Sequence, residues 1–169
     1  DHVIDDLGAA GDAVLDSGPA TAGIESTVVR VNGTVLEVLR HGALSTADIL
    51  AAVPELTSAI DPPARSSAAS PGQLITHYSP TTGTVALRAG ATLPSEFAAG
   101  SRRVVVLGYD RPATSGLIET RSLGSRDDLD GVARTLYAKL RSADEAGADL
   151  IVVELTGADD IGRALDDRI

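Results

Sequence analysis

The 169-residue chain is long enough for one domain or two small ones. Hydrophobic residues make up 43% of it and aromatic residues only 2%, so its core must consist of Val, Leu, Ile and Ala, which suits strands covered by helices. A net charge of −10, with Lys139 as the single lysine, disfavours a broad nucleic-acid-binding surface. The absence of cysteine excludes disulfides, thiolate zinc sites and cysteine nucleophiles.

The sequence contains neither a bilayer-spanning run of ~20 apolar residues nor a leader of secretory type, so we expect a cytoplasmic protein. It begins with DHVIDD and contains no methionine. We therefore expect the chain to be part of a longer one.

The first third of the chain predicts part of an α/β unit. The elements expected are a helix end, a short strand, a β-hairpin and a short helix, at residues 2–7, 12–19, 25–40 and 45–53. Asn32 and Gly33 lie between two β-branched runs, which is a strong hairpin signal. Ser45 or Thr46 is the expected N-cap of the short helix.

Residues 54–80 predict a linker, because five prolines and many Ser, Thr and Ala residues leave few large apolar anchors. The domain division expected is therefore residues 1–53, a linker at 54–80, and a second unit at 81–169.

Residues 81–169 predict a small Rossmann-like α/β layer, because strand and helix patterns alternate. Strands are expected at residues 84–89, 102–110, 118–124 and 149–156, and helices at 125–146 and 159–169. Ser125, followed three residues later by Asp128, gives the longer helix a start like a capping box, and Gly147 ends it.

Ser26 and Thr27 lie at the mouth of the first hairpin strand, where hydroxyl groups can bind a polar ligand. Their side chains should point to opposite sides, so one of them at most faces a site. Spacing alone favours an ordinary strand start.

Arg40 ends the second strand and can clamp a phosphate or carboxylate, with Gly42 permitting close approach. The alternative is a surface arginine beside a solvated His41.

Tyr78 lies in the linker segment SPGQLITHYSP, residues 70–80. It could stack on a base or contact a phosphate, or it could equally pin the linker to a domain.

The three histidines lack metal-ligand spacing, so we assign no metal site. Lys139 and Arg141 are expected on a solvated helix face, and the Gly-rich segments match neither a P-loop nor a dinucleotide fingerprint.

Three segments resemble, in order, one protein family: LDSGPATAGIESTVV, VLRHGALSTADI and SPGQLITHYSP. The family is the two-domain form of the YrdC-like threonylcarbamoyl-AMP synthases. The later segment LYAKLRSADEAGADLIVVEL also resembles their C-terminal domain. His41 and Arg30 depart from the family pattern, which has proline and often aspartate there.

The resemblance implies an enzyme that makes threonylcarbamoyl-AMP and pyrophosphate from L-threonine, bicarbonate and ATP, for threonylcarbamoyladenosine in tRNA. It implies that Ser26 contacts threonine, that Arg40 holds nucleotide phosphates, and that Tyr78 covers the nucleotide as part of a lid. Mg²⁺ is the expected counter-ion of ATP, with no ligands identified. The acidic chain is not expected to grip tRNA itself, and proteins that transfer the threonylcarbamoyl group are possible partners.

The resemblance also implies a missing half. The family's Lys-x-Arg strand and Ser-x-Asn segment lie upstream of everything in this chain, and Lys139 is already placed on a C-terminal helix. We expect the C-terminal portion of the enzyme, inactive by itself, with no catalytic residue of its own. It would comprise the last part of the YrdC-like α/β catalytic domain at residues 1–53, the lid linker at 54–80, and an accessory Rossmann-like α/β domain at 81–169. The alternative is a non-catalytic α/β module that binds a nucleotide or a partner protein. A third possibility is that the accessory domain serves only to position the linker.

Overall fold

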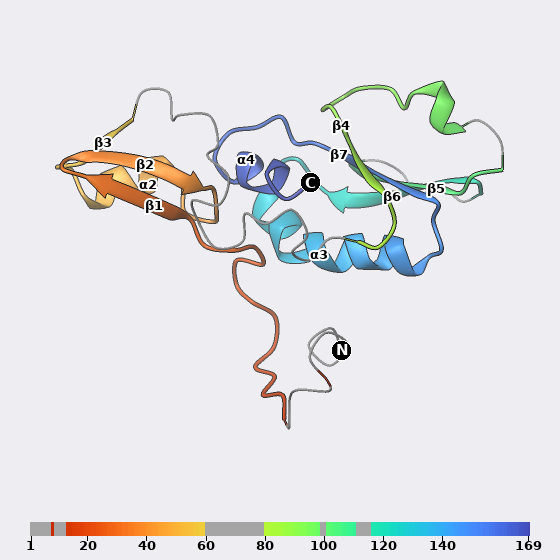
Figure 1. The fold of residues 1–169 in the computed structure, drawn as a ribbon, viewed down its shortest axis with the longest axis horizontal. Coiled ribbons are helices and arrows are strands. Elements are labelled where there is room, and N and C mark those ends of the chain that lie inside the picture. Colours follow the sequence, from red (N-terminus) through yellow and green to blue (C-terminus); the bar gives the residue numbers. More distant parts are fainter. Residues whose placement is uncertain (1–7, 9–12, 60–79, 99–100, 111–115) are drawn as a thin grey trace.

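The computed structural model describes residues 8, 13–59, 80–98, 101–110 and 116–169. It contains a three-stranded sheet and a four-stranded sheet, which lie in different parts of the molecule (Figure 1). The helix end predicted at residues 2–7 and most of the predicted linker, including Tyr78, lie outside the described residues.

The smaller sheet has the strand order β1-β2-β3, with β1 at Val28–Asn32, β2 at Val35–Arg40 and β3 at Thr57–Ser58. β1 and β2 form the predicted antiparallel hairpin, and β3 pairs parallel with β2. Asn32 is the last strand residue and pairs with Val35, so the turn residues are Gly33 and Thr34 and the predicted turn is shifted by one position. Gly33 has a φ of +62°, which explains the glycine there.

Helix α2, at Thr46–Ala52, follows the hairpin. Ser45 is the N-cap: its hydroxyl accepts from the amide of Asp48, and the Asp48 carboxylate accepts from the amide of Ser45. These hydrogen bonds from Ser45 lower the pKa of the Asp48 carboxyl. The structure thus decides between the two N-cap candidates.

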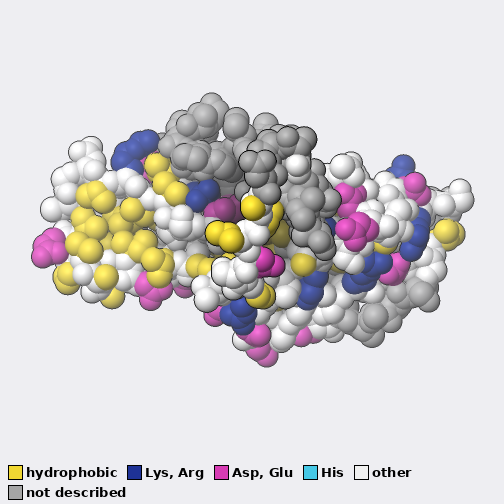
Figure 2. Space-filling view, turned by 90° about the horizontal axis from the view of Figure 1, so that it is seen from below, with side chains coloured by type: hydrophobic (Ala, Val, Ile, Leu, Met, Phe, Trp, Pro, Cys, Tyr) yellow, Lys and Arg dark blue, Asp and Glu magenta, His cyan; other side chains and the backbone are white. Residues whose placement is uncertain are grey.

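The smaller sheet has little core of its own. Leu36 is the only fully buried residue of its described strands, and α2 has no buried residue. Val31, Val35, Leu44 and Val53 are each at least 40% exposed. Figure 2 shows hydrophobic side chains gathered over this end of the molecule.

The strand predicted at residues 12–19 is wrong. Residues 13–19 contain no strand, and the Leu15 side chain is 99% exposed. A run of three apolar residues has the right composition for a strand, but without a paired neighbour its backbone groups gain no ladder.

The larger sheet confirms the predicted α/β class. Its strands, β4 at Thr84–Leu87, β5 at Val104–Tyr109, β6 at Ile118–Gly124 and β7 at Leu150–Glu154, have the order β4-β7-β5-β6 and are all parallel. Every residue of β5 and β7 is buried, as expected for the central strands of a sheet covered on both faces.

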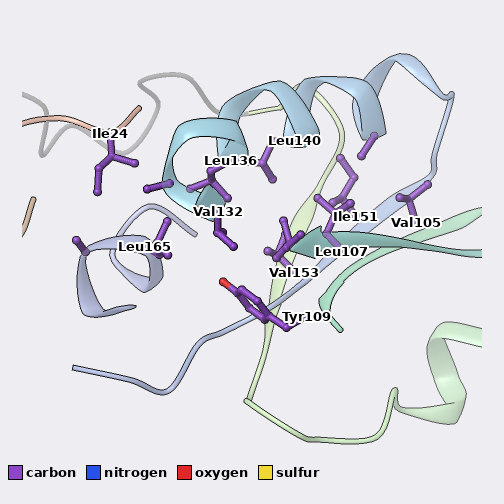
Figure 3. Close-up of a cluster of buried hydrophobic side chains, with 14 residues drawn as sticks. Ile24, Val105, Leu107, Tyr109, Val132, Leu136, Leu140, Ile151, Val153 and Leu165 are labelled. Atoms are coloured by element: carbon purple, nitrogen blue, oxygen red, sulfur yellow. The ribbon is translucent and has the colours of Figure 1, made fainter. Parts of the chain in front are cut away.

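Helices α3, at Leu129–Glu145, and α4, at Ile161–Asp166, pack against one face of this sheet (Figure 3). The predicted helix start at Ser125 is wrong, because Asp128 is the N-cap and accepts from the amide of Gly131 at 2.9 Å. A carboxylate at this position both caps the amides and complements the helix dipole. Gly147, with a φ of +69°, follows the helix end as predicted.

The apolar side chains of the larger sheet form two clusters. One lies between the sheet and the helices and includes Leu107, Ile151, Leu136 and Leu165 (Figure 3). The other lies on the opposite face, where Phe97 of the 3-10 helix η1, Ser95–Ala98, packs against it. Ile24, which lies just ahead of the hairpin, belongs to the first cluster, so the chain from the smaller sheet is tied into this core.

Candidate functional site

The hairpin brings together Ser26 and Arg40, the two candidate site residues that lie in the described part of the chain. Arg40 donates from Nε to the main-chain oxygen of Ser26 at 3.1 Å and from Nη2 to its Oγ at 3.3 Å. Arg40 pairs with Val28 in the ladder, so the strand register itself sets this contact. Ser26 is exposed and Arg40 half-buried, which leaves a hydroxyl beside a guanidinium at the open end of the hairpin.

The neighbouring hydroxyl has a different role. Thr27 donates from Oγ1 to the main-chain oxygen of Leu44 at 2.7 Å and so holds the turn that follows β2. The two adjacent hydroxyls therefore have separate partners, and the expectation that at most one of them faces a site stays a prediction. Gly42 is buried against the same segment: a Cβ there would lie 2.2 Å from the amide nitrogen of Thr27. The close approach that Gly42 permits is to the chain's own backbone.

Glu25, immediately before Ser26, is held by two residues of the unit at residues 81–169, which contains the larger sheet with α3 and α4 and is called the C-terminal domain below. Arg168 donates from Nε to its Oε2 at 2.8 Å, and the Tyr137 hydroxyl lies 3.0 Å from both carboxylate oxygens. Burial opposes ionisation of Glu25, but the hydrogen bond and charge of Arg168 and the bond from Tyr137 outweigh it and lower the pKa of the carboxyl. Burial and the Glu25 carboxylate raise the pKa of Tyr137 to about 12.

Arg168 also holds the chain directly after Arg40. Its Nη1 donates to the main-chain oxygen of His41 at 2.7 Å and to that of Ala164 at 2.8 Å. A single arginine near the C-terminal end of the described chain thus contacts the residue before Ser26 and the residue after Arg40.

Gly23 fixes the same segment against α3. Its φ is +75°, and a Cβ there would lie 2.2 Å from the Cα of Arg134. Only glycine lets the backbone approach the helix this closely. Glycine is therefore required at position 23 by the packing of this segment on α3.

Tyr78 itself lies outside the described residues, but the chain just after it is fixed. The Asp144 carboxylate accepts from the amide of Thr81 at 2.9 Å, from its hydroxyl at 2.8 Å and from the amide of Thr82 at 2.8 Å. Burial opposes the effect of these bonds, which nevertheless lower the pKa of Asp144 to about 2. The end of the predicted linker is thus anchored near the C-terminal end of α3.

Lys139 differs from the expectation of a solvated side chain. Its Nζ donates to the main-chain oxygen of Leu123 at 2.6 Å, and burial lowers its pKa. Its role in the structure is to join α3 to β6.

At the carboxyl end of the larger sheet, where open α/β sheets often bind ligands, Glu154 and Arg126 bond to each other. Glu154 is buried and accepts from Arg126 Nη2 at 2.7 Å and from the amides of Gly90 at 3.0 Å and Tyr109 at 3.3 Å. The Arg126 guanidinium stacks 4.6 Å from the centre of the Tyr109 ring.

Within the described ranges, no helix is both long and apolar enough to cross a membrane. These ranges also hold no group of three or more His, Cys, Asp or Glu side chains placed to bind a metal ion.

The molecule thus combines a hairpin that carries a hydroxyl and a guanidinium with an α/β domain built on a parallel four-stranded sheet, to which the hairpin is bonded. The family model described as "Threonylcarbamoyl-AMP synthase, C-terminal domain" matches residues 39–169, and the chain belongs to this family.

Two curated relatives are named threonylcarbamoyl-AMP synthase. The one from Bacillus subtilis is 32% identical over 181 residues, covering 100% of this chain and 51% of the relative. The one from Pyrococcus abyssi is 26% identical over 181 residues, covering 99% and 51%. The chain therefore spans about half the length of the curated relatives it matches.

Solved structures also match the fold of this chain. P. abyssi Sua5 complexed with L-threonine matches with a TM-score of 0.76 and 25% identity, over 99% of this chain and 51% of that one. A variant of P. abyssi Sua5 with an adjacent histidine and tyrosine both replaced by alanine matches with a TM-score of 0.72 and 22% identity, over 99% and 50%, and supports the fold.

Sequence reasoning missed Glu25, Arg168 and Tyr137 as a group. Glu25 lies 143 residues from Arg168 and 112 from Tyr137, so no local pattern joins them. The only signal was the glutamate inside the GIESTVV segment, which contributes to the family resemblance without indicating a partner for its charge.

Proposed function

We propose that this chain is the C-terminal portion of an L-threonylcarbamoyladenylate synthase, which makes threonylcarbamoyl-AMP and pyrophosphate from L-threonine, bicarbonate and ATP. The product would serve threonylcarbamoyladenosine formation in tRNA. The observation that carries the proposal is the contact between Arg40 and Ser26 at the open end of the hairpin, in a chain of this family.

Ser26 is proposed to bind L-threonine or its carboxylated form. Because Arg40 Nη2 donates to Ser26 Oγ, the hydroxyl proton points away from the guanidinium and can be donated to a carboxylate or carbamate. The adjacent positive charge strengthens that donor. The P. abyssi Sua5 structure is a complex with L-threonine, which supports this assignment by likeness.

Arg40 is proposed to hold ATP phosphates. The planar guanidinium matches a phosphate in geometry and charge, and the bonds to Ser26 fix its orientation before the nucleotide arrives. Mg²⁺ is expected to bind through the phosphates of ATP, and we assign it no residue of this chain.

Tyr78 is proposed to cover the nucleotide as part of a lid. Chain length supports this: Thr81 is fixed to Asp144, three residues after Tyr78, and three extended residues span about 10 Å. Helix α3 rises by about the same distance between Tyr137 and Asp144. A segment of this length is long enough to bring Tyr78 level with Tyr137 in the middle of α3, where the Tyr137 hydroxyl bonds Glu25, the residue before Ser26. A closed lid would keep water from the labile carboxylated threonine.

The remaining half of the site is proposed to come from an upstream segment of about the same length as this chain. Three observations support it: the curated relatives are about twice as long, the smaller sheet exposes Val31, Val35 and Leu44, and the sole lysine, Lys139, is bonded within the C-terminal domain. Upstream strands that extend the sheet would cover this apolar surface.

Pyrophosphate release from ATP in the presence of L-threonine and bicarbonate tests the proposal. The chain alone should give none, and a protein extended upstream to the length of its relatives should give turnover that depends on both co-substrates. Turnover by the chain alone would show that the catalytic half is not missing. If the extended protein binds ATP but does not consume it with threonine, the alternative of a non-catalytic nucleotide-binding module is favoured.

A further inference from the structure

The C-terminal domain contacts the hairpin at the two positions that flank the proposed site. Arg168 Nε bonds Glu25, the residue before Ser26, and Arg168 Nη1 bonds the main-chain oxygen of His41, the residue after Arg40. The Tyr137 hydroxyl donates to the same Glu25 carboxylate. One arginine and one tyrosine thus bracket both strands at the point where Ser26 and Arg40 meet.

Apolar packing lies beside these contacts. Ile24 is buried among the residues that line α3 and α4, close to Leu136 and Leu165 (Figure 3). Gly23 lies directly against the α3 backbone, as its conflict with Arg134 shows. The segment that leads into Ser26 is consequently part of the core of the C-terminal domain.

The arrangement is poorly suited to a role in stability alone. The Arg168 side chain is only 7% exposed, and its Nη2 is buried without a hydrogen-bond partner among the residues that the structure describes. Burying a guanidinium with an unsatisfied donor carries a desolvation cost that an apolar side chain would avoid. What Arg168 supplies in return is geometry, because its planar guanidinium bonds at once to Glu25, ahead of β1, and to His41, directly after β2.

We propose that Arg168, with Tyr137, is a positioning residue for the Ser26–Arg40 pair, so that the C-terminal domain acts as a fixed support for the substrate site. This inference rests on the proposed function for its effect on substrates, but its structural part can be tested independently of that function. It assigns a task to the C-terminal domain that requires no ligand of its own.

The structural part is tested by distances in the chain as it stands. The chain has no cysteine, so spin labels can be placed at single introduced cysteines. Labels at Thr34→Cys in the hairpin turn and at Glu145→Cys on α3, both outside the buried core, report the distance between the hairpin and the C-terminal domain. Ala138→Cys with Arg163→Cys, both exposed within the domain, form the control pair.

Arg168→Met should broaden the hairpin-to-domain distance distribution and leave the control pair unchanged. An unchanged hairpin-to-domain distribution would overturn the proposal. If Arg168→Met unfolds the chain, the control pair will broaden too; Arg168→Lys and Tyr137→Phe, which remove fewer bonds, then give the same two outcomes.

The functional part is tested by L-threonine titration of the upstream-extended protein. Arg121→Met is a matched control: Arg121 bonds Glu119 through Nε at 2.6 Å and the main-chain oxygen of Ser142 through Nη1 at 2.8 Å, both away from the site. Arg168→Met should weaken threonine binding about tenfold or more, Arg168→Lys less, and Arg121→Met less than about twofold at a similar loss of Tm.

The outcomes separate the two proposals. Equal threonine affinity in Arg168→Met and Arg121→Met would refute the positioning role while the proposed function stands. If the unsubstituted extended protein binds no threonine, the proposed function fails, and the spin-label distances still decide whether Arg168 fixes the hairpin.

Discussion

Arg40 reaches back across fourteen positions to bond both the main chain and the hydroxyl of Ser26. The β1–β2 register produces this contact, and the contact in turn sets which way the Ser26 hydroxyl donates. Both residues of the candidate site thus belong to a single β-hairpin, whose strands pair over a short sequence separation. It is held from outside by the C-terminal domain.

Replacing Ser26 tests the threonine contact. In the upstream-extended protein, Ser26→Ala should weaken L-threonine binding about ten- to hundredfold, because a hydrogen bond to a charged group contributes about 1.5–3 kcal/mol. Calorimetric titration measures it. Thr27→Val is the control: it removes the bond to Leu44 and should lower Tm while changing threonine affinity less than about twofold. An equal loss in both variants would indicate general damage to the hairpin.

Replacing Gly23 tests the packing of this segment on α3. Gly23→Ala should destabilise the chain by about 3 kcal/mol or more, since it adds a backbone clash to the cost of a positive φ. Gly90→Ala isolates the second term, because Gly90 has a φ of +69° and nothing within 4 Å of an added Cβ. It should cost about 1–2 kcal/mol. Urea unfolding compares the two; equal losses would mean that the close approach of Gly23 to α3 is unimportant.

Alkaline pH should weaken the contact between the two parts of the chain. The pKa of Tyr137 is raised to about 12 from an ordinary value of 10.0, so between these values the unfolded chain loses the proton and the folded chain keeps it. The contribution of the Tyr137 hydroxyl to the free energy of unfolding is therefore fully present below pH 10 and is lost as the pH rises towards 12.

Burial raises the pKa of Tyr109 to about 12 as well, so the wild-type slope has two contributions. Tyr137→Phe should reduce the fall in unfolding free energy over this range and remove one late-titrating phenol from the absorbance titration. A slope unaltered by Tyr137→Phe would contradict the raised pKa.

The larger domain could be predicted well from the sequence because its signals are local. Continuous apolar runs predicted β5 and β7, and helical spacing predicted α3, whose start alone was misplaced by the competing caps Ser125 and Asp128. The run around Leu15 failed because a strand needs a partner that composition does not reveal.

The site could be predicted only in part. Residue type and spacing alone favoured an ordinary strand start at Ser26 and a surface arginine at Arg40, and the family resemblance marked both as candidates. The hairpin brings the two side chains together. The Glu25–Arg168 pair could not be found, since the attraction between two charges 143 residues apart depends on the whole tertiary fold. Lys139 was expected in solvent because a helical wheel does not show the Leu123 carbonyl that receives it.

The central claim is that this chain supplies one guanidinium to an ATP site completed by upstream residues. The most direct measurement is pyrophosphate release by the upstream-extended protein with Arg40→Ala, beside Arg30→Ala, whose guanidinium bonds Glu37 on the exposed hairpin surface. We predict that Arg40→Ala weakens ATP binding by about tenfold or more and reduces turnover in parallel, while Arg30→Ala remains near wild type. Wild-type ATP affinity and turnover in Arg40→Ala would contradict the account.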